Sequence, residues 1–177
     1  MVKDLVAYAK QKGLEVGVSA EDASRTNIDY LISLFKMVEE LKGDRVCLCD
    51  TIGILTPDIT YDMVQKIIPE LKIPLGIHCH NDFGLATANT LFALKAGASE
   101  FHATINGVGE RSGNTPLEEI VMILKQQYNT PLNIKYDKIF TLSREVSNLM
   151  TVPIQPNKAI IGGNSFTHES GIHTDGM

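Results

Sequence analysis

The sequence predicts an α/β protein built on a parallel sheet, either open or closed into an eight-stranded barrel. One unit recurs along the 177 residues: a short β-rich run, a polar loop, and an amphipathic helix of about three turns, with a period of about thirty residues. Repeated units of this kind, joined by right-handed crossovers, form parallel sheets. The polar residues follow the strand in every unit, and loops at the carboxyl ends of strands carry the active site in barrel enzymes.

Each element is expected from its pattern of apolar residues and from the residues that bound it. The chain opens with the tail of a helix over Asp4–Gln11. The expected strands are the β-rich runs Leu14–Ser19, Arg45–Cys49, Leu75–His80 and Glu100–Ile105. The expected helices run from about Asn27 to Leu41, from Pro57 to Leu71, from Gly84 to Lys95 with a stop at Gly97, and from Pro116 through Leu124. Four such units cannot close an eight-stranded barrel alone.

Composition narrows the classes of partner. The chain has 44% hydrophobic and 21% charged residues, with a net charge of −5, which is typical of a globular protein. Its basic residues are scattered, so we expect neither nucleic acid nor membrane as a partner. No apolar run approaches the roughly 20 residues that span a bilayer, and the start does not resemble a signal peptide, so a cytoplasmic location is expected. Three cysteines, all in expected strands, predict free buried thiols.

The segment His78-Cys79-His80 at the end of an apolar run is the most informative local pattern. Side chains alternate between the two faces of a strand, so His78 and His80 share a face and Cys79 occupies the other. Two nitrogen donors would then converge at the carboxyl end of a strand, where parallel α/β folds bind ligands. Taken alone, the pair also fits ordinary polar residues at a strand end.

Asn114 closes a glycine-rich segment, Gly107–Asn114, that follows the next expected strand. The segment fits neither a phosphate-binding loop nor a dinucleotide-binding loop, because its spacing and its residues differ from both. The amide of Asn114 could join the two imidazoles around a divalent ion, and mixed nitrogen and oxygen donors suit Mn, Fe, Co or Zn better than Ca. The alternative for Asn114 is a helix cap before Pro116.

A second histidine pair, in His168-Glu169-Ser170-Gly171-Ile172-His173, does not have the spacing of the zinc-protease motif. A histidine in a loop of small polar residues can instead act as a general base.

Five motifs, in order, resemble the signatures of the 2-isopropylmalate synthase, homocitrate synthase and citramalate synthase family, and the resemblance covers essentially the whole chain. They are Ser19–Ala23, Asp50–Gly53, His78–Asp82, Gly109–Asn114 and Ser170–His173. The resemblance implies a TIM barrel that condenses acetyl-CoA with a 2-oxo acid on a divalent metal such as Mn, Zn or Mg. Gln155–Ile160 leans toward the isopropylmalate branch, which serves leucine biosynthesis, while Phe166–Glu169 is also similar to homocitrate synthases.

The resemblance also implies roles for single residues. His78, His80 and Asn114 are implied to bind the metal, Thr51 to donate a hydrogen bond to the 2-oxo acid, and Glu21 to assist proton transfer. The resemblance further implies that His173 helps to deprotonate the acetyl methyl group and that the full-length protein is a homodimer. Local sequence offers a structural alternative for two of these residues. Glu21 also fits a charge in the first turn of a helix, and Thr51 also fits a hydroxyl in a turn.

One departure from the family pattern is informative. The family's first strand carries an Arg-Asp-Gly type motif that supplies a metal aspartate and an arginine, and this sequence contains no such motif. The expected fold is therefore the C-terminal half of a TIM (β/α)8 barrel, a fragment without the first strands and inactive alone. Residues 1–130 would form the partial barrel, and residues 131–177 a post-barrel helix and the start of a linker subdomain. The alternative functions are a lyase of the same superfamily, such as hydroxymethylglutaryl-CoA lyase, a carboxyltransferase domain, or a noncatalytic metal-binding fragment.

Overall fold

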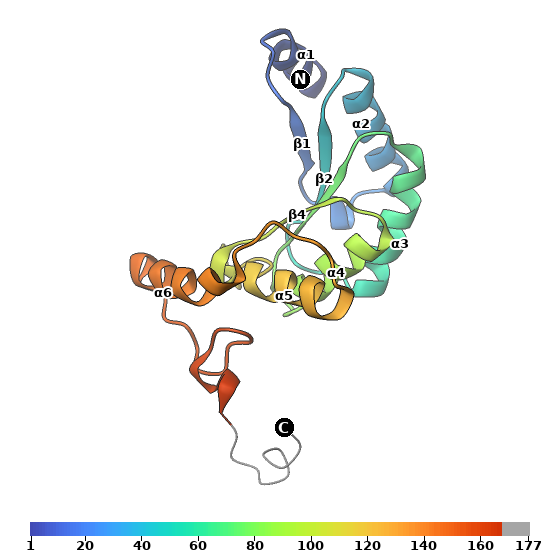
Figure 1. Ribbon diagram of the computed structural model, residues 1–177. Coiled ribbons are helices and arrows are strands. Elements are labelled where there is room, and N and C mark those ends of the chain that lie inside the picture. The colour runs from blue at the N-terminus through green and yellow to red at the C-terminus, as the bar shows by residue number, and fades with distance from the viewer. Residues whose placement is uncertain (168–177) are drawn as a thin grey trace. The chain divides into compact units, whose positions relative to one another are not determined.

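The structure is a computed structural model that describes residues 1–167, and the chain divides into two compact units (Figure 1). The first unit contains residues 1–104 and 109–115, and the second contains residues 105–108 and the chain from Pro116 onward. The predicted boundary near residue 130 stays a prediction about the whole protein.

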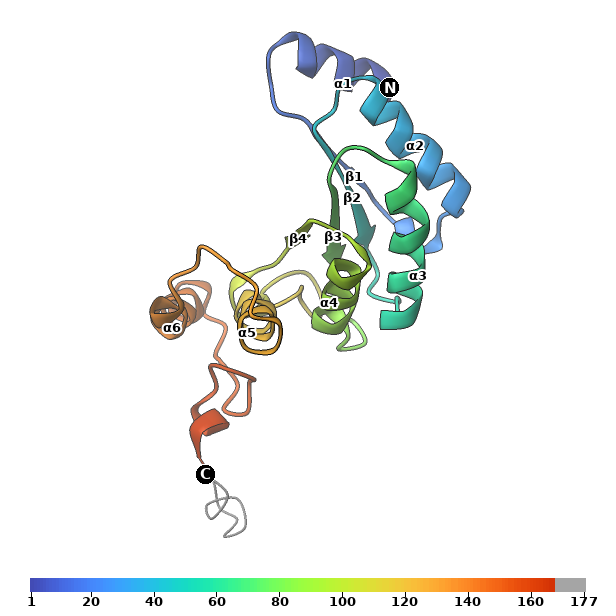
Figure 2. The same ribbon diagram turned by 45° about the vertical axis from the view of Figure 1, so that its right-hand side comes forward.

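A four-stranded parallel sheet, in the order β1-β2-β3-β4, forms the centre of the first unit. Its helices α2, α3 and α4 lie along one face of the sheet (Figure 2). The elements of this unit are α1 (Val2–Gln11), β1 (Gly17–Ala20), the 3-10 helix η1 (Ala23–Arg25), α2 (Ile28–Glu40), β2 (Arg45–Asp50), α3 (Pro57–Ile67), the 3-10 helix η2 (Ile68–Glu70), β3 (Leu75–Cys79), α4 (Ala86–Ala96) and β4 (Glu100–His102). The predicted α/β fold with a parallel sheet is confirmed.

The core lies between the sheet and these helices. Leu31, Phe35 and Val38 are buried at helical spacing on α2 and pack with alternate strand residues such as Leu48 and Ile77. Because strand side chains alternate, the other face of β2 and β3 carries Cys47, Cys49, His78 and His80. The two histidines therefore lie on the face of the sheet opposite the helices.

Local signals set most helix ends. The side chain of Asn27 accepts hydrogen bonds from the backbone N–H groups of Asp29 and Tyr30, at 2.9 and 3.3 Å, and so caps α2. Gly97 ends α4 with a φ of 116°, a conformation that favours glycine.

The predicted bounds differ from the structure at several ends. β1 begins at Gly17 and not at Leu14, β4 ends at His102, and α4 begins at Ala86. α5 begins at Leu117, and Pro116 occupies the N-cap position just before it. The three cysteines are free and buried, as predicted.

The second unit contains α5 (Leu117–Tyr128) and α6 (Ile139–Met150), together with the 3-10 helices η3 (Ile105–Gly107), η4 (Tyr136–Lys138) and η5 (Gly163–Phe166). Its buried carboxylate, Glu118 at 1% exposure, accepts a hydrogen bond from the backbone N–H of Asn106 at 3.0 Å. The amide of Asn106 in turn donates to the backbone carbonyl of Ser143 at 2.8 Å. Lys158, which lies in the segment after α6, forms ion pairs with Glu118 and Glu119.

Glu118 is expected to make the stability of the chain depend on pH. Burial raises the pKa of this carboxyl, and the opposing effects of Asn106 and Lys158 are smaller. The folded state therefore holds the proton more tightly than the unfolded state, so the free energy of unfolding falls as pH rises through the unfolded and then the folded pKa. Glu118→Gln should remove this decrease, as measured by urea unfolding from pH 4 to pH 8.

The alanine variant separates the charge of Glu118 from its hydrogen bond. Glu118→Ala leaves the Asn106 N–H without its acceptor and should cost about 1–3 kcal/mol at every pH. Equal pH profiles for wild type and Glu118→Gln would contradict the prediction.

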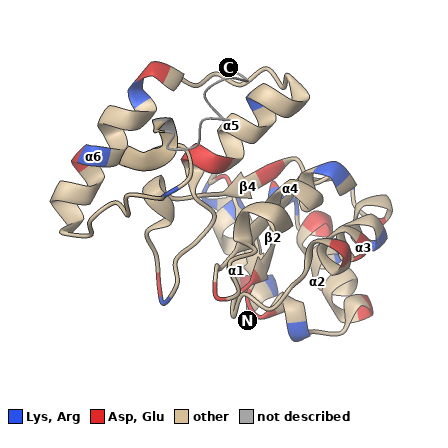
Figure 3. Cartoon of the chain, turned by 90° about the horizontal axis from the view of Figure 1, so that it is seen from below, with Lys and Arg blue, Asp and Glu red and all other residues tan. Residues whose placement is uncertain are grey.

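Acidic and basic residues are interspersed over α2 and α3 (Figure 3). Within residues 1–167, no helix combines the length and the apolar character that crossing a membrane requires.

Candidate metal centre

The end of β3 places both histidines on one face of the sheet, as predicted. Cys79 is fully buried among the core residues on the helix side of the strand. His78 is half-buried and His80 is 8% exposed, and their rings meet edge to face with centroids 5.0 Å apart. The Nε2 atoms of the two rings are 3.3 Å apart. Because side chains alternate along a strand, the two imidazole nitrogens lie on the same face and close to one point.

Asn114 reaches the same point from the loop after β4. It forms an isolated antiparallel bridge with His80, and its amide Nδ2 lies 3.2 Å from Nε2 of His78. A half-turn of the amide would present its oxygen there instead. The N-cap of α5 is Pro116, so the alternative role for Asn114 as a helix cap is wrong.

The protonation state of His78 suits a ligand. Burial, together with the neighbouring His80 and His102, lowers its pKa below the usual 6.5, against a smaller opposing effect of Glu21. The imidazole is therefore neutral at pH 7, with a lone pair available on one nitrogen. The Nδ1 atoms of His78 and His80 are buried and have no hydrogen-bond partner among the described residues.

The donor set fits a divalent ion. The two Nε2 atoms lie close enough together that both imidazoles could bind one divalent ion. Residues 1–167 hold no group of three or more His, Cys, Asp and Glu side chains arranged for a metal. The third donor here is the amide of Asn114, so this chain would offer two imidazoles and one amide oxygen.

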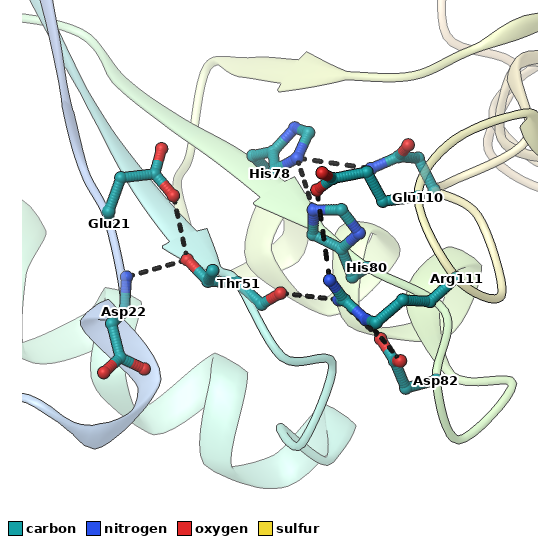
Figure 4. Close-up of polar contacts among 9 residues, drawn as sticks. Glu21, Asp22, Thr51, His78, His80, Asp82, Glu110 and Arg111 are labelled. Carbon is teal, nitrogen blue, oxygen red and sulfur yellow. Dashed lines mark hydrogen bonds and ion pairs between the residues drawn. The ribbon is translucent and has the colours of Figure 1, made fainter.

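Glu21 and Thr51 meet beside the histidines at the ends of β1 and β2 (Figure 4). The hydroxyl of Thr51 donates to Oε2 of Glu21 at 3.0 Å and accepts the backbone N–H of Asp22 at 2.7 Å. The sequence predicted both residues for the site, but not their hydrogen bond. In this arrangement the hydroxyl proton of Thr51 points to Glu21, and its donation to a substrate stays a prediction.

Three further residues shape the loops around the site, and the sequence patterns predicted a role for none of them. Asp50 is fully buried and accepts the N–H groups of Ile54 and Leu55, at 3.1 and 3.0 Å, which shapes the turn after β2. Asp82 and Arg111 form a two-bond ion pair between the loops after β3 and β4. All three are charged residues inside the motifs that resemble the family, and this position was the signal that could have pointed to them. The predicted catalytic residue His173 lies outside the described residues.

Comparison with known proteins gives the class. Residues 1–146 match the HMGL-like family. The chain therefore belongs to the HMGL-like family, in agreement with the resemblance seen in the sequence.

Particular relatives are similar over nearly the whole chain. The (R)-citramalate synthase of Methanocaldococcus jannaschii is 51% identical over 172 residues, which cover 97% of this chain and 35% of that protein. The 2-isopropylmalate synthase of the same organism is 48% identical over 174 residues, 98% of this chain and 34% of that protein. The chain thus spans about a third of the length of these curated relatives.

A solved structure supports the fold. The HMG-CoA lyase of Acinetobacter baumannii, in complex with coenzyme A and 3-methylmalate, matches with a TM-score of 0.76 and 25% identity. The match covers 96% of this chain and 59% of that one.

Proposed function

We propose that this chain supplies the metal-binding part of an acyltransferase that condenses acetyl-CoA with a short 2-oxo acid. The observation that carries the proposal is the convergence of His78, His80 and Asn114 at the carboxyl end of the sheet, in a chain about half identical to citramalate and isopropylmalate synthases. The whole protein is proposed to be a cytoplasmic homodimer.

His78, His80 and Asn114 would hold the divalent ion, which would supply Lewis-acid polarisation of the keto group. Neutral imidazoles and an amide oxygen favour Mn, Fe, Co or Zn over Ca. Because the described part of the chain contributes two imidazoles and one amide, the substrate and residues elsewhere in the whole protein would complete the coordination.

The residues beside this centre would handle protons. In the proposed reaction the acetyl methyl carbon loses a proton and bonds to the keto carbon, and hydrolysis of the thioester then releases coenzyme A. Thr51 fixes the carboxylate of Glu21 by its 3.0 Å hydrogen bond, so that Glu21 can receive or relay a proton. His173 is retained as the proposed base for the methyl group.

A lyase is the second candidate, because solved HMG-CoA lyases share the fold. That reaction cleaves a carbon–carbon bond in an acyl-CoA, whereas the synthase consumes acetyl-CoA with a 2-oxo acid. The two are separated by which acyl-CoA is consumed.

A chimera tests the proposal. Replacing the matching segment of the M. jannaschii (R)-citramalate synthase with this chain should give an enzyme that releases free coenzyme A from acetyl-CoA in the presence of pyruvate or 2-oxoisovalerate. The isolated chain should show no turnover. A folded, metal-binding chimera that is inactive with both 2-oxo acids, or that cleaves hydroxymethylglutaryl-CoA instead, would refute the synthase assignment.

A further inference from the structure

We propose that Arg111 is a positioning residue for the candidate metal centre, because it ties the loop that carries Asn114 to the loops after β2 and β3. The inference rests on the proposed function, since it concerns the same donor set.

Two backbone hydrogen bonds hold the C-terminal end of the Asn114 loop against the end of β3 and the residues that follow it. The N–H of Asn81 donates to the carbonyl of Gly113 at 2.9 Å, and the N–H of Thr115 donates to the carbonyl of Cys79 at 3.3 Å. These two bonds flank Asn114. The outer half of the loop, residues 109–112, lies beyond them, and the side chain of Arg111 extends from it to the neighbouring loops.

The guanidinium of Arg111 joins three loops at once (Figure 4). Its Nε and Nη2 donate to the two carboxylate oxygens of Asp82 at 2.8 and 2.9 Å, and Nη2 also donates to the backbone carbonyl of Thr51 at 2.7 Å. A planar fork of donors can make these bonds together, whereas the single ammonium of lysine cannot reproduce them.

The carboxylate of Asp82 also lies close to the turn after β2. Gly53 has a φ of +63°, and a Cβ there would lie 2.6 Å from Oδ2 of Asp82 and 3.0 Å from the carbonyl oxygen of His80. The turn therefore packs directly against the segment that follows the histidines.

The backbone of Arg111 supports a role for its side chain. Arg111 has a φ of 54°, in the left-handed region that glycine adopts most easily. Such a conformation at a residue other than glycine costs energy and is often found where the side chain has a function.

Arg25 offers a matched control. It forms the same two-bond pair with Asp22, at 2.9 and 2.7 Å, and both pairs are partly exposed. The Arg25 pair joins residues three apart in one loop, whereas the Arg111 pair joins residues 29 apart in two loops. Ordinary surface ion pairs contribute little, so the two arginines should differ only if the link between loops matters.

The experiment compares Arg111→Met, Arg111→Lys and Arg25→Met with the wild-type chain. Mn²⁺ affinity is measured by calorimetry, and exchange of the Asn81 and Thr115 backbone amides is measured without metal. Arg111→Met should weaken Mn²⁺ binding about tenfold, in the range known for residues that orient ligands, and should speed both exchange rates. Arg111→Lys should also fall short of the wild type in both Mn²⁺ affinity and protection from exchange. Arg25→Met should match the wild type in both.

Two outcomes would overturn the inference: wild-type Mn²⁺ affinity and exchange in a folded Arg111→Met, or equal losses in Arg111→Met and Arg25→Met. If Arg111→Met does not fold, Arg111→Lys, which keeps the positive charge, takes its place. Wild-type Mn²⁺ affinity and exchange in Arg111→Lys, or losses equal to those of Arg25→Met, would then overturn the inference. If the wild-type chain fails to bind Mn²⁺, the proposed function fails, and the metal-free exchange rates still decide whether Arg111 fixes the loop.

Discussion

Replacing either His78 or His80 with alanine should lower the affinity of the chain for Mn²⁺ by at least about 100-fold, because losing a ligand costs more than losing a residue that only orients one. The two Nε2 atoms lie 3.3 Å apart, so each variant removes half of a converging pair. Calorimetric titration of the isolated chain with MnCl₂ measures the effect. The same variants in the chimera should lose turnover.

His102 provides the control for this prediction. Its ring contacts His78 edge to face with centroids 5.4 Å apart, and it is exposed, so His102→Ala removes an imidazole from the same face without removing a proposed ligand. It should change Mn²⁺ affinity by less than about tenfold. If all three alanine variants bind alike, the metal centre is not at His78 and His80.

The pH dependence of binding has a definite sign. Protons compete with a metal for imidazole nitrogens, so affinity falls as pH falls through the pKa of an imidazole ligand such as His78. Because burial lowers the pKa of His78, this ligand should lose the metal only below the pH at which an exposed histidine would. Titrations of the chain with MnCl₂ at several pH values would show the pH at which binding is lost.

The sequence predicted the histidine pair because strand alternation is a local rule. The identity of the two residues and their spacing sufficed, and the structure needed only to supply a strand over Leu75–Cys79. Asn114 was predicted less directly, since its position opposite His80 depends on the pairing of two loops that are distant in the sequence. The motif order of the family supplied that link.

The contacts around these donors could not be predicted from local patterns. The hydrogen bond from Thr51 to Glu21 joins residues 30 apart, and the pair between Arg111 and Asp82 joins residues 29 apart. No periodicity encodes such contacts, since they depend on which loops meet at the edge of the sheet. The positive φ of Arg111 is likewise a property of the folded loop.

Gly109→Ala should weaken Mn²⁺ binding by about tenfold or more, through a steric effect on one ligand. A Cβ at Gly109 would lie 1.8 Å from Oδ1 and 2.8 Å from Cγ of Asn114, a separation that atoms cannot adopt. The amide of Asn114 must therefore leave its place beside His78. Unlike Gly53, Gly109 does not have a positive φ, so the new methyl group adds no backbone strain at that residue.

A double-mutant cycle makes the Gly109 prediction specific. Asn114→Ala removes the atoms that the new Cβ would strike, so Gly109→Ala should have little further effect on Mn²⁺ affinity in that background. Gly163→Ala, where a Cβ meets no atom of residues 1–167 that the structure describes within 4 Å, should leave both affinity and thermal unfolding unchanged. Additive losses in the double variant would mean that Gly109 acts by another route. Loss of affinity only in the presence of the Asn114 amide would show that Gly109 acts through that amide.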